Sequence, residues 1–184
     1  CEIAQVGNDG FANLRFAALA NVAPFNPFFP AAYSQGQAPA FGFAMQCADE
    51  ALQAFQQAKN LEEAQINLLK RLEKAATAME VVTNKLAKKY GVIFKGFDFS
   101  PAPYPQDWCS LGAALEAVGV AKLGLAGSLA AAAFLADTLQ KGQWLKTGFN
   151  GVMLPVLEDS RLATRSAEGV LGVYDLLLYS AVCG

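Results

Sequence analysis

The chain has 184 residues, of which 54% are hydrophobic and 16% are charged, and its formal net charge is −2. This length suits a single domain over residues 1–184, and so apolar a composition excludes intrinsic disorder. The acidic balance argues against nucleic-acid binding, and the absence of histidine excludes His-dependent catalytic triads and His-ligated zinc or haem. We therefore expect neither a nucleic-acid partner nor a metal site.

Helical periodicity dominates the first half of the chain. The spacing of apolar residues predicts helices over Asp9–Ala23, Phe41–Lys59 and Leu61–Tyr90. The third helix has the strongest local signals, because Asn60 suits an N-cap and Gly91 suits the position after the last turn. Its apolar residues also repeat at a spacing close to that of a heptad seam.

Two proline-rich connectors carry many aromatic residues. The first covers Pro24–Ala40, and the second covers Gly91–Gln106. Proline disfavours helix and favours an extended path. Val92–Phe99 alternates well enough for a short strand, but no partner strand is evident in the sequence. We therefore expect this segment to be an extended strap across the helices.

The second half of the chain is also predicted to be helical. One helix is expected over Asp107–Gln140, and a last helix is capped by Asp159 or Ser160 and ends near Val182. Between them, Gly142–Pro155 is expected to be irregular or to hold a short helix. The predicted fold class is all-α: an antiparallel bundle of four to five helices with Pro/Phe-rich extended connectors.

Four widely spaced cysteines, namely Cys1, Cys47, Cys109 and Cys183, predict two disulfide bonds. In an up-and-down bundle all four meet at one end, and we favour the pairs Cys47–Cys109 and Cys1–Cys183. A first residue that is cysteine suggests a mature chain without its leader. We therefore expect an extracytoplasmic oxidising compartment, whether secreted, periplasmic or the lumen of an organelle. Buried free thiols and a lipidated Cys1 are the alternatives.

A stripe of small residues runs along the helix predicted over Asp107–Gln140. Gly124, Ser128 and Ala132 follow one another at intervals that place them on one helix face. Such a ridge favours close packing against the last helix, and it would also admit a flat apolar ligand. In that second interpretation the bound molecule is a lipid, sterol or pigment, and no other cofactor is expected.

No constellation for catalysis is evident. The adjacent carboxylates Asp49–Glu50, Glu62–Glu63 and Glu158–Asp159 lie at predicted helix starts, where capping explains them. Signatures of phosphate-binding and dinucleotide-binding loops are missing from the sequence. We therefore expect that the protein is not an enzyme.

Low charge and aromatic connectors favour a protein partner or self-association, with membrane association as a further alternative. The predicted function is that of a non-catalytic, extracytoplasmic interaction or structural subunit in a larger or membrane-associated assembly. The alternative is a carrier of an apolar ligand. Val118–Ala136 is too rich in alanine and glycine for a membrane span and is expected to be a buried helix. The candidate interface or ligand residues are Phe25, Phe28, Phe29, Phe94, Phe97, Gly124, Ser128, Ala132, Phe134, Trp144 and Phe149.

Overall fold

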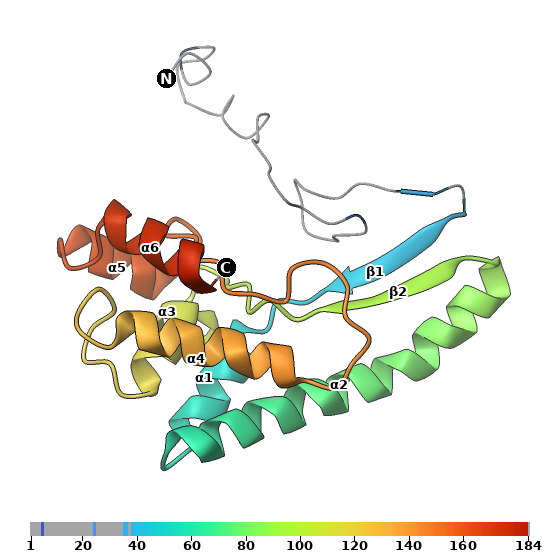
Figure 1. The fold of residues 1–184 in the computed structure, drawn as a ribbon, viewed down its shortest axis with the longest axis horizontal. Coiled ribbons are helices and arrows are strands. Elements are labelled where there is room, and N and C mark those ends of the chain that lie inside the picture. Colours follow the sequence, from blue (N-terminus) through green and yellow to red (C-terminus); the bar gives the residue numbers. More distant parts are fainter. Residues whose placement is uncertain (1–4, 6–23, 25–34, 37, 184) are drawn as a thin grey trace.

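The computed structural model describes residue 5, residue 24, residues 35–36 and residues 38–183. Within them the chain forms six α-helices, one short 3₁₀ helix and two strands (Figure 1). In chain order these are β1 (Ala40–Ala44), α1 (Ala48–Gln56), α2 (Leu61–Tyr90), β2 (Ile93–Asp98), η3 (Asp107–Cys109), α3 (Leu111–Ala117), α4 (Ser128–Lys141), α5 (Ser160–Ala167) and α6 (Val173–Cys183). The predicted helix over Asp9–Ala23 lies outside the described residues, as do Cys1, Phe25, Phe28 and Phe29.

A two-stranded parallel sheet of β1 and β2 shows that the predicted all-α fold class is wrong, because the fold is α/β. The register pairs Ala40 with Ile93 and Ala44 with Asp98. Parallel strands need a long crossover, and α1 and α2 provide it. The helix predicted from Phe41 is wrong over the β1 segment, because the strand that pairs with this segment follows only after the crossover. The strap over Val92–Phe99 is therefore a paired strand.

The opposite side of β2 pairs briefly with the segment after α4. The N–H of Phe97 donates to the carbonyl of Leu145 at 2.8 Å, and the carbonyl of Phe97 accepts from the N–H of Thr147 at 3.1 Å. Gly96 makes this approach possible, since a Cβ at its position would lie 2.3 Å from the carbonyl oxygen of Leu145. Its φ of 121° is also one that other residues rarely adopt. The irregular segment predicted over Gly142–Pro155 is confirmed apart from this bridge.

The long helix α2 agrees with the sequence prediction at both ends. Asn60 is its N-cap, and the side-chain Oδ1 accepts from the N–H of Glu63 at 2.9 Å. Gly91 ends the helix with a φ of 65°, the left-handed conformation that glycine adopts without strain. Leu68 and Leu72 face the core. Local signals alone therefore determine this element.

The helix predicted over Asp107–Gln140 is divided into η3, α3 and α4. A loop over residues 118–127 separates α3 from α4, and Gly119, Gly124 and Gly127 in it have φ values of 111°, 104° and 94°. These conformations lie far from those of a helix. Glycine is unfavourable inside a helix, and these three glycines belong instead to a tight loop.

The last predicted helix is likewise divided, into α5 and α6. Asp159 caps α5, and its Oδ1 accepts from the N–H of Arg161 at 2.9 Å and of Leu162 at 3.0 Å. Its Oδ2 accepts from the N–H of Gly112 in α3 at 3.1 Å. One buried carboxylate thus holds the N-termini of two helices together. Gly169, with a φ of 71°, marks the break before α6.

The helices gather at one end of the sheet. Figure 1 shows both strands running toward the side where α1, α3, α4, α5 and α6 lie, while α2 runs back along the sheet to the start of β2. Helix α1 packs against both α2 and α3, and α4 packs against α6. The core includes Phe55 of α1, Leu115 of α3 and Leu135 of α4. The carboxyl ends of the strands therefore point into the helical half of the fold.

Candidate functional site at the carboxyl edge of the sheet

The carboxyl ends of β1 and β2 lie side by side, because Ala44 pairs with Asp98 in the parallel register. The N–H of Met45 then donates to the carbonyl of Asp98 at 3.0 Å. The segments that leave the two strands therefore start from one place in the fold. In open parallel sheets this edge is where ligands bind. We take it as the candidate functional site.

Asp98 is fully buried at this edge and accepts four hydrogen bonds. Its Oδ1 accepts from the backbone N–H of Ser100 at 2.9 Å, from the hydroxyl of Ser100 at 2.6 Å and from the N–H of Asn150 at 3.0 Å. Its Oδ2 accepts from the N–H of Phe149 at 2.7 Å. These donors replace water around the carboxylate. Asp98 therefore anchors the segment after α4 to the end of β2.

Asn150 completes this anchor from the other side. It is buried and has a φ of 47°, a left-handed conformation that asparagine tolerates better than most residues. Its Oδ1 accepts from the N–H of Phe99 and from the indole N–H of Trp144, both at 3.2 Å. Its Nδ2 donates to the carbonyls of Phe97 at 3.3 Å and Thr147 at 2.7 Å. The side chain thus joins β2 to the loop over residues 144–150.

Two exposed aromatic side chains follow β2. Tyr104 and Trp108 are 47% and 61% exposed, and their ring centroids lie 6.4 Å apart with an angle of 31° between the planes. The N–H of Tyr104 donates to the carbonyl of Cys109 at 3.0 Å, and the N–H of Cys109 donates to the carbonyl of Gln106 at 3.0 Å. These bonds close the backbone of the loop that carries both rings. We call Tyr104 and Trp108 the aromatic platform.

Polar side chains lie beside the aromatic platform. The exposed Gln46 follows β1, and its Nε2 lies 3.5 Å from the carbonyl of Pro103, directly before Tyr104. Asp107, directly before Trp108, is exposed, and its Oδ1 accepts from the hydroxyl of Ser160 at 2.7 Å. An amide and a carboxylate therefore accompany two exposed ring faces.

Two buried thiols lie behind this surface. Cys47 precedes α1, and Cys109 ends η3. Burial raises the pKa of the Cys47 thiol well above its ordinary value, and the nearby carboxylates of Asp49 and Asp98 raise it further. Only the thiolate is a strong nucleophile, so this environment does not activate Cys47.

The cysteines of the described chain, Cys47, Cys109 and Cys183, are all free thiols. Cys183 lies against α4, where its Sγ is 4.0 Å from the carbonyl oxygen of Leu129. The predicted disulfide between Cys47 and Cys109 is therefore wrong, and Cys183 is likewise unpaired. Cys1 lies outside the described residues.

Three of the aromatic residues predicted as site candidates belong to one continuous cluster. The ring centroids of Phe94 and Phe97 are 5.0 Å apart, and those of Phe97 and Phe99 are 5.6 Å apart. Trp144 meets Phe99 edge to face at 5.0 Å. These rings pack β2 against the segment after α4.

The other two aromatic candidates within the described residues lie outside this cluster. Phe134 of α4 packs against Phe55 of α1 at 5.7 Å between ring centroids. Phe149 is 36% exposed, and its N–H donates to Asp98.

The small residues predicted to line one ridge are divided between a loop and a helix. Gly124 lies in the loop over residues 118–127, where a Cβ would be 2.2 Å from the carbonyl oxygen of Val170. Ser128 begins α4, and its hydroxyl accepts from the N–H of Gly124 at 2.9 Å and donates to the carbonyl of Leu125 at 2.7 Å. Ala132 is buried in α4. The three residues thus pack the loop and α4 against their neighbours.

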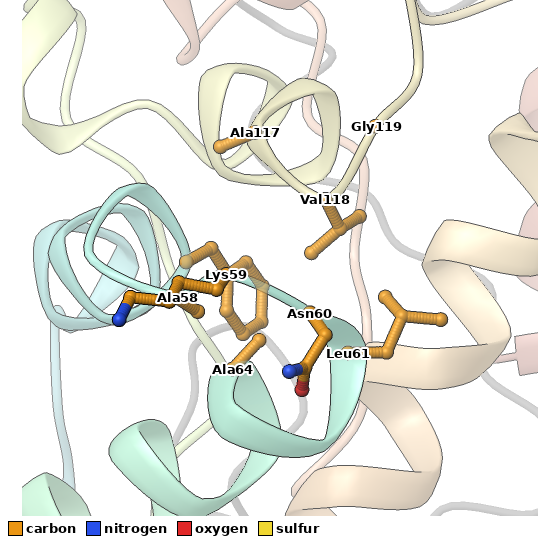
Figure 2. Close-up of a pocket in the computed structure, with 9 residues that line it drawn as sticks. Ala58, Lys59, Asn60, Leu61, Ala64, Ala117, Val118 and Gly119 are labelled. Carbon is orange, nitrogen blue, oxygen red and sulfur yellow. The ribbon is translucent and has the colours of Figure 1, made fainter.

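A hollow of about 250 Å³ lies where α1 turns into α2 beside the end of α3. Figure 2 shows the ammonium of Lys59 turned away from Val118 across the hollow. The amide oxygen of Asn60 is engaged in the cap of α2. This hollow is therefore a gap between helix ends. Its lining residues are Phe55, Ala58, Lys59, Asn60, Leu61, Ala64, Ala117, Val118 and Gly119.

A second hollow of about 350 Å³ lies between β1 and the last turns of α2. It is at the amino end of the strands, opposite the candidate site. Its lining residues are Ala40, Phe41, Phe43, Leu86, Tyr90 and Val92.

The described part of the chain holds neither a metal-binding cluster nor a helix suited to cross a membrane. No group of three or more His, Cys, Asp or Glu side chains there is placed to hold a metal ion. None of the helices in this part of the chain has both the length and the apolar composition of a membrane span.

The comparison with known families matches the whole chain, residues 1–184, to the family described as "Uncharacterised ACR (DUF711)". The chain belongs to the DUF711 family. Among its relatives is a "UPF0210 protein" of the archaeon Sulfurisphaera tokodaii, which is 33% identical over 178 residues. That alignment covers 92% of this chain and 40% of the relative.

Other relatives also align with nearly the whole of this chain but over only part of their own length. The "UPF0210 protein" of Pyrobaculum islandicum is 35% identical over 182 residues, covering 94% of this chain and 40% of that protein. The "UPF0210 protein" of the bacterium Bifidobacterium adolescentis is 27% identical over 193 aligned residues, covering 98% of this chain and 41% of that protein. The chain thus spans about two-fifths of the length of these relatives.

Family membership corrects the predicted function and location. The relatives come from archaea and bacteria, and their names indicate neither a secreted structural subunit nor a lipid carrier. The predictions of an extracytoplasmic interaction subunit and of an apolar-ligand carrier are therefore wrong. The prediction of an oxidising compartment is also wrong, because the described cysteines are free thiols.

Sequence reasoning missed six residues of the candidate site, namely Gln46, Asp98, Tyr104, Asp107, Trp108 and Asn150. A signal for Asp98 does exist, because an apolar alternating run ends at a carboxylate followed by a serine two positions later. This signal indicates a site residue only if Val92–Phe99 is known to be a strand of a parallel sheet. No sequence pattern predicts that Trp108 is exposed, because its exposure depends on how the loop after β2 closes.

Proposed function

We propose that this chain contributes a binding site for a small polar molecule that carries a heteroaromatic or sugar ring, seated on the aromatic platform at the carboxyl edge of the sheet. The observation that carries the proposal is the exposed pair of Tyr104 and Trp108, held 6.4 Å apart at this edge. Aromatic faces stack on heteroaromatic rings and on the C–H faces of sugars. The neighbouring amide of Gln46 and carboxylate of Asp107 would bind hydroxyl or amino groups at the rim of such a ring.

The side chains of Asp98 and Cys47 at this edge support a role in binding a ligand and not in reacting with it. Asp98 already accepts four hydrogen bonds, so it is engaged as an anchor. Burial raises the pKa of the Cys47 thiol and keeps it neutral. We therefore assign this part of the protein a binding role. In a longer family member, the remaining three-fifths of the chain would add further contacts to the ligand.

The two tryptophans give a direct test, because Trp108 is 61% exposed and Trp144 is 7% exposed. A Trp144→Phe variant leaves Trp108 as the sole source of tryptophan fluorescence. We expect adenosine or methyl glucoside, added at millimolar concentration, to quench this fluorescence saturably. Tyr104→Ala is expected to raise the dissociation constant at least about tenfold, because it removes one stacking face.

Tyr174→Ala is the matched control, because Tyr174 is 85% exposed on α6. Its dissociation constant should equal that of the parent. The proposal fails if neither compound quenches Trp108, or if Tyr104→Ala and Tyr174→Ala have equal effects.

A further inference from the structure

Helix α6 is apolar on two opposite sides. Tyr179 and Cys183 are buried against the rest of the chain, and α6 packs on α4. Asp175 is the one charged residue of the helix. Its carboxylate is engaged locally, because Oδ2 accepts from the N–H of Gly172 at 2.8 Å. The sequence therefore supplies α6 with very little polar surface to present to water.

The outer side of α6 is an exposed apolar stripe. Its residues are Val173, Tyr174, Leu177, Leu178 and Val182, which are 64%, 85%, 63%, 50% and 59% exposed. They recur at the spacing of one helix face, two residues wide. Figure 1 shows α6 at the periphery of the fold with α4 beneath it. We call these five residues the α6 stripe.

A helix that is apolar all round is normally buried on both sides. A stripe of this width on a water-exposed helix marks a contact surface. At 11 residues α6 is far shorter than the roughly 20 residues that cross a membrane. The stripe is thus suited to packing against another apolar protein surface.

We propose that the α6 stripe is covered by an apolar face of the same, longer polypeptide, supplied by the part of a DUF711 protein that lies outside these 184 residues. The lengths support this occupant, because the chain spans only 40% of its archaeal relatives. A surface supplied by the same polypeptide is present at high effective concentration and needs no second molecule. The stripe then becomes part of the core of the longer protein.

Thiol labelling tests this proposal. Leu178→Cys is made in the 184-residue chain and in the full-length polypeptide that carries these residues, and both are treated with a maleimide. Leu157→Cys, at a position that is 94% exposed, is the labelling control. We expect the two cysteines to react at similar rates in the short chain. In the full-length polypeptide, Leu178→Cys should react at least about tenfold more slowly than Leu157→Cys.

A charged variant tests the same surface without labelling. Leu177→Glu combined with Leu178→Glu should leave the thermal midpoint of the short chain nearly unchanged, because both positions are exposed there. The same pair should lower the midpoint of the full-length polypeptide, because it places carboxylates in a buried contact.

Three results would overturn the proposal. The first is equal labelling of Leu178→Cys in both lengths of chain. The second is a concentration-dependent dimer of the short chain that the charged variant abolishes, which would assign the stripe to a second copy. The third is binding of the full-length polypeptide to vesicles of phosphatidylglycerol and phosphatidylcholine that the charged variant abolishes, which would assign it to a lipid surface.

Discussion

At the scale of single residues, two glycines of the loop over residues 118–127 have similar backbone conformations and different surroundings. Gly119 and Gly124 have φ values of 111° and 104°. A Cβ on Gly119 would meet nothing within 4 Å, whereas a Cβ on Gly124 would lie 2.2 Å from the carbonyl oxygen of Val170. The pair therefore separates the cost of an unusual φ from the cost of a steric clash.

We expect Gly119→Ala to lower the free energy of unfolding by about 1–2 kcal/mol, the cost of a side chain at positive φ. Gly124→Ala should cost about 1–3 kcal/mol more, because the backbone before α6 must also move. Urea unfolding of the two variants measures the difference. Equal losses would show that the loop yields freely around Gly124.

Also at the scale of single residues, the buried carboxylates of Asp98 and Asp159 are surrounded by hydrogen-bond donors. Each is nearly inaccessible to solvent, and each is surrounded by backbone N–H groups and a hydroxyl. Dipoles of this kind stabilise a buried negative charge. A carboxylate in such a setting organises the backbone around it, as both residues do here by joining segments far apart in the sequence.

At the scale of elements, the ion pair and hydrogen bonds of Glu116 join α3, α5 and the loop before α4. Glu116 of α3 accepts from Nε of Arg165 at 2.6 Å and from Nη2 of Arg165 at 3.0 Å. It also accepts from the N–H of Leu123 at 2.9 Å. Burial by itself would raise the pKa of Glu116, but these hydrogen bonds and the charges of Arg165 and Arg161 outweigh it and hold the pKa below its ordinary value.

The lowered pKa of Glu116 predicts a pH dependence of stability. The folded protein binds a proton at this site less readily than the unfolded chain, whose carboxyl titrates near 4.5. The contribution of Glu116 to stability is therefore complete above that value and is lost as the pH falls through the lower folded pKa. Glu116→Gln should cost about 2–3 kcal/mol at pH 7, because it weakens the contacts of the buried Arg165.

Urea unfolding from pH 7 to pH 3 measures this effect. The stability of Glu116→Gln should fall less over this interval than that of the parent. Glu158→Gln, which alters an exposed carboxylate outside the ion-pair cluster, should follow the parent profile. A parent-like slope for Glu116→Gln would contradict the assignment.

At the scale of the whole molecule, the thiol of Cys47 reports on opening of the fold. It is 5% exposed, and burial raises its pKa, so alkylation requires both exposure to solvent and loss of a proton. Cys47 lies between the end of β1 and the start of α1, where the sheet meets the helical half. Its exposure therefore requires these two parts to separate.

We expect iodoacetamide to label Cys47 in water far more slowly than in concentrated urea. Where opening and closing are fast, the rate follows the open population, and a destabilised variant such as Gly124→Ala should label about tenfold faster for each 1.4 kcal/mol lost. Peptide mapping by mass spectrometry identifies the labelled residue. Rapid labelling of the native chain at Cys47 would contradict the buried position.

Sequence by itself determined those parts of the protein whose signals are local. Helix α2 follows from the cap at Asn60, from the apolar spacing and from the left-handed Gly91, all of which lie within the helix or next to it. The irregular segment after α4 follows from its glycines and prolines in the same way. Each of these signals acts through backbone groups a few residues away, so no distant contact is needed to interpret it.

Tertiary structure alone decided the sheet, the division of the later helices and the candidate site. The segment of β1 has apolar spacing that fits a helix, and it becomes a strand because β2, about 50 residues later, pairs with it. The breaks at residues 118–127 and at Gly169 place glycines at positive φ, and the first of them brings Gly124 against the backbone of Val170, which lies just before α6. The aromatic platform and the α6 stripe are defined by exposure, and exposure depends on the packing of the whole chain.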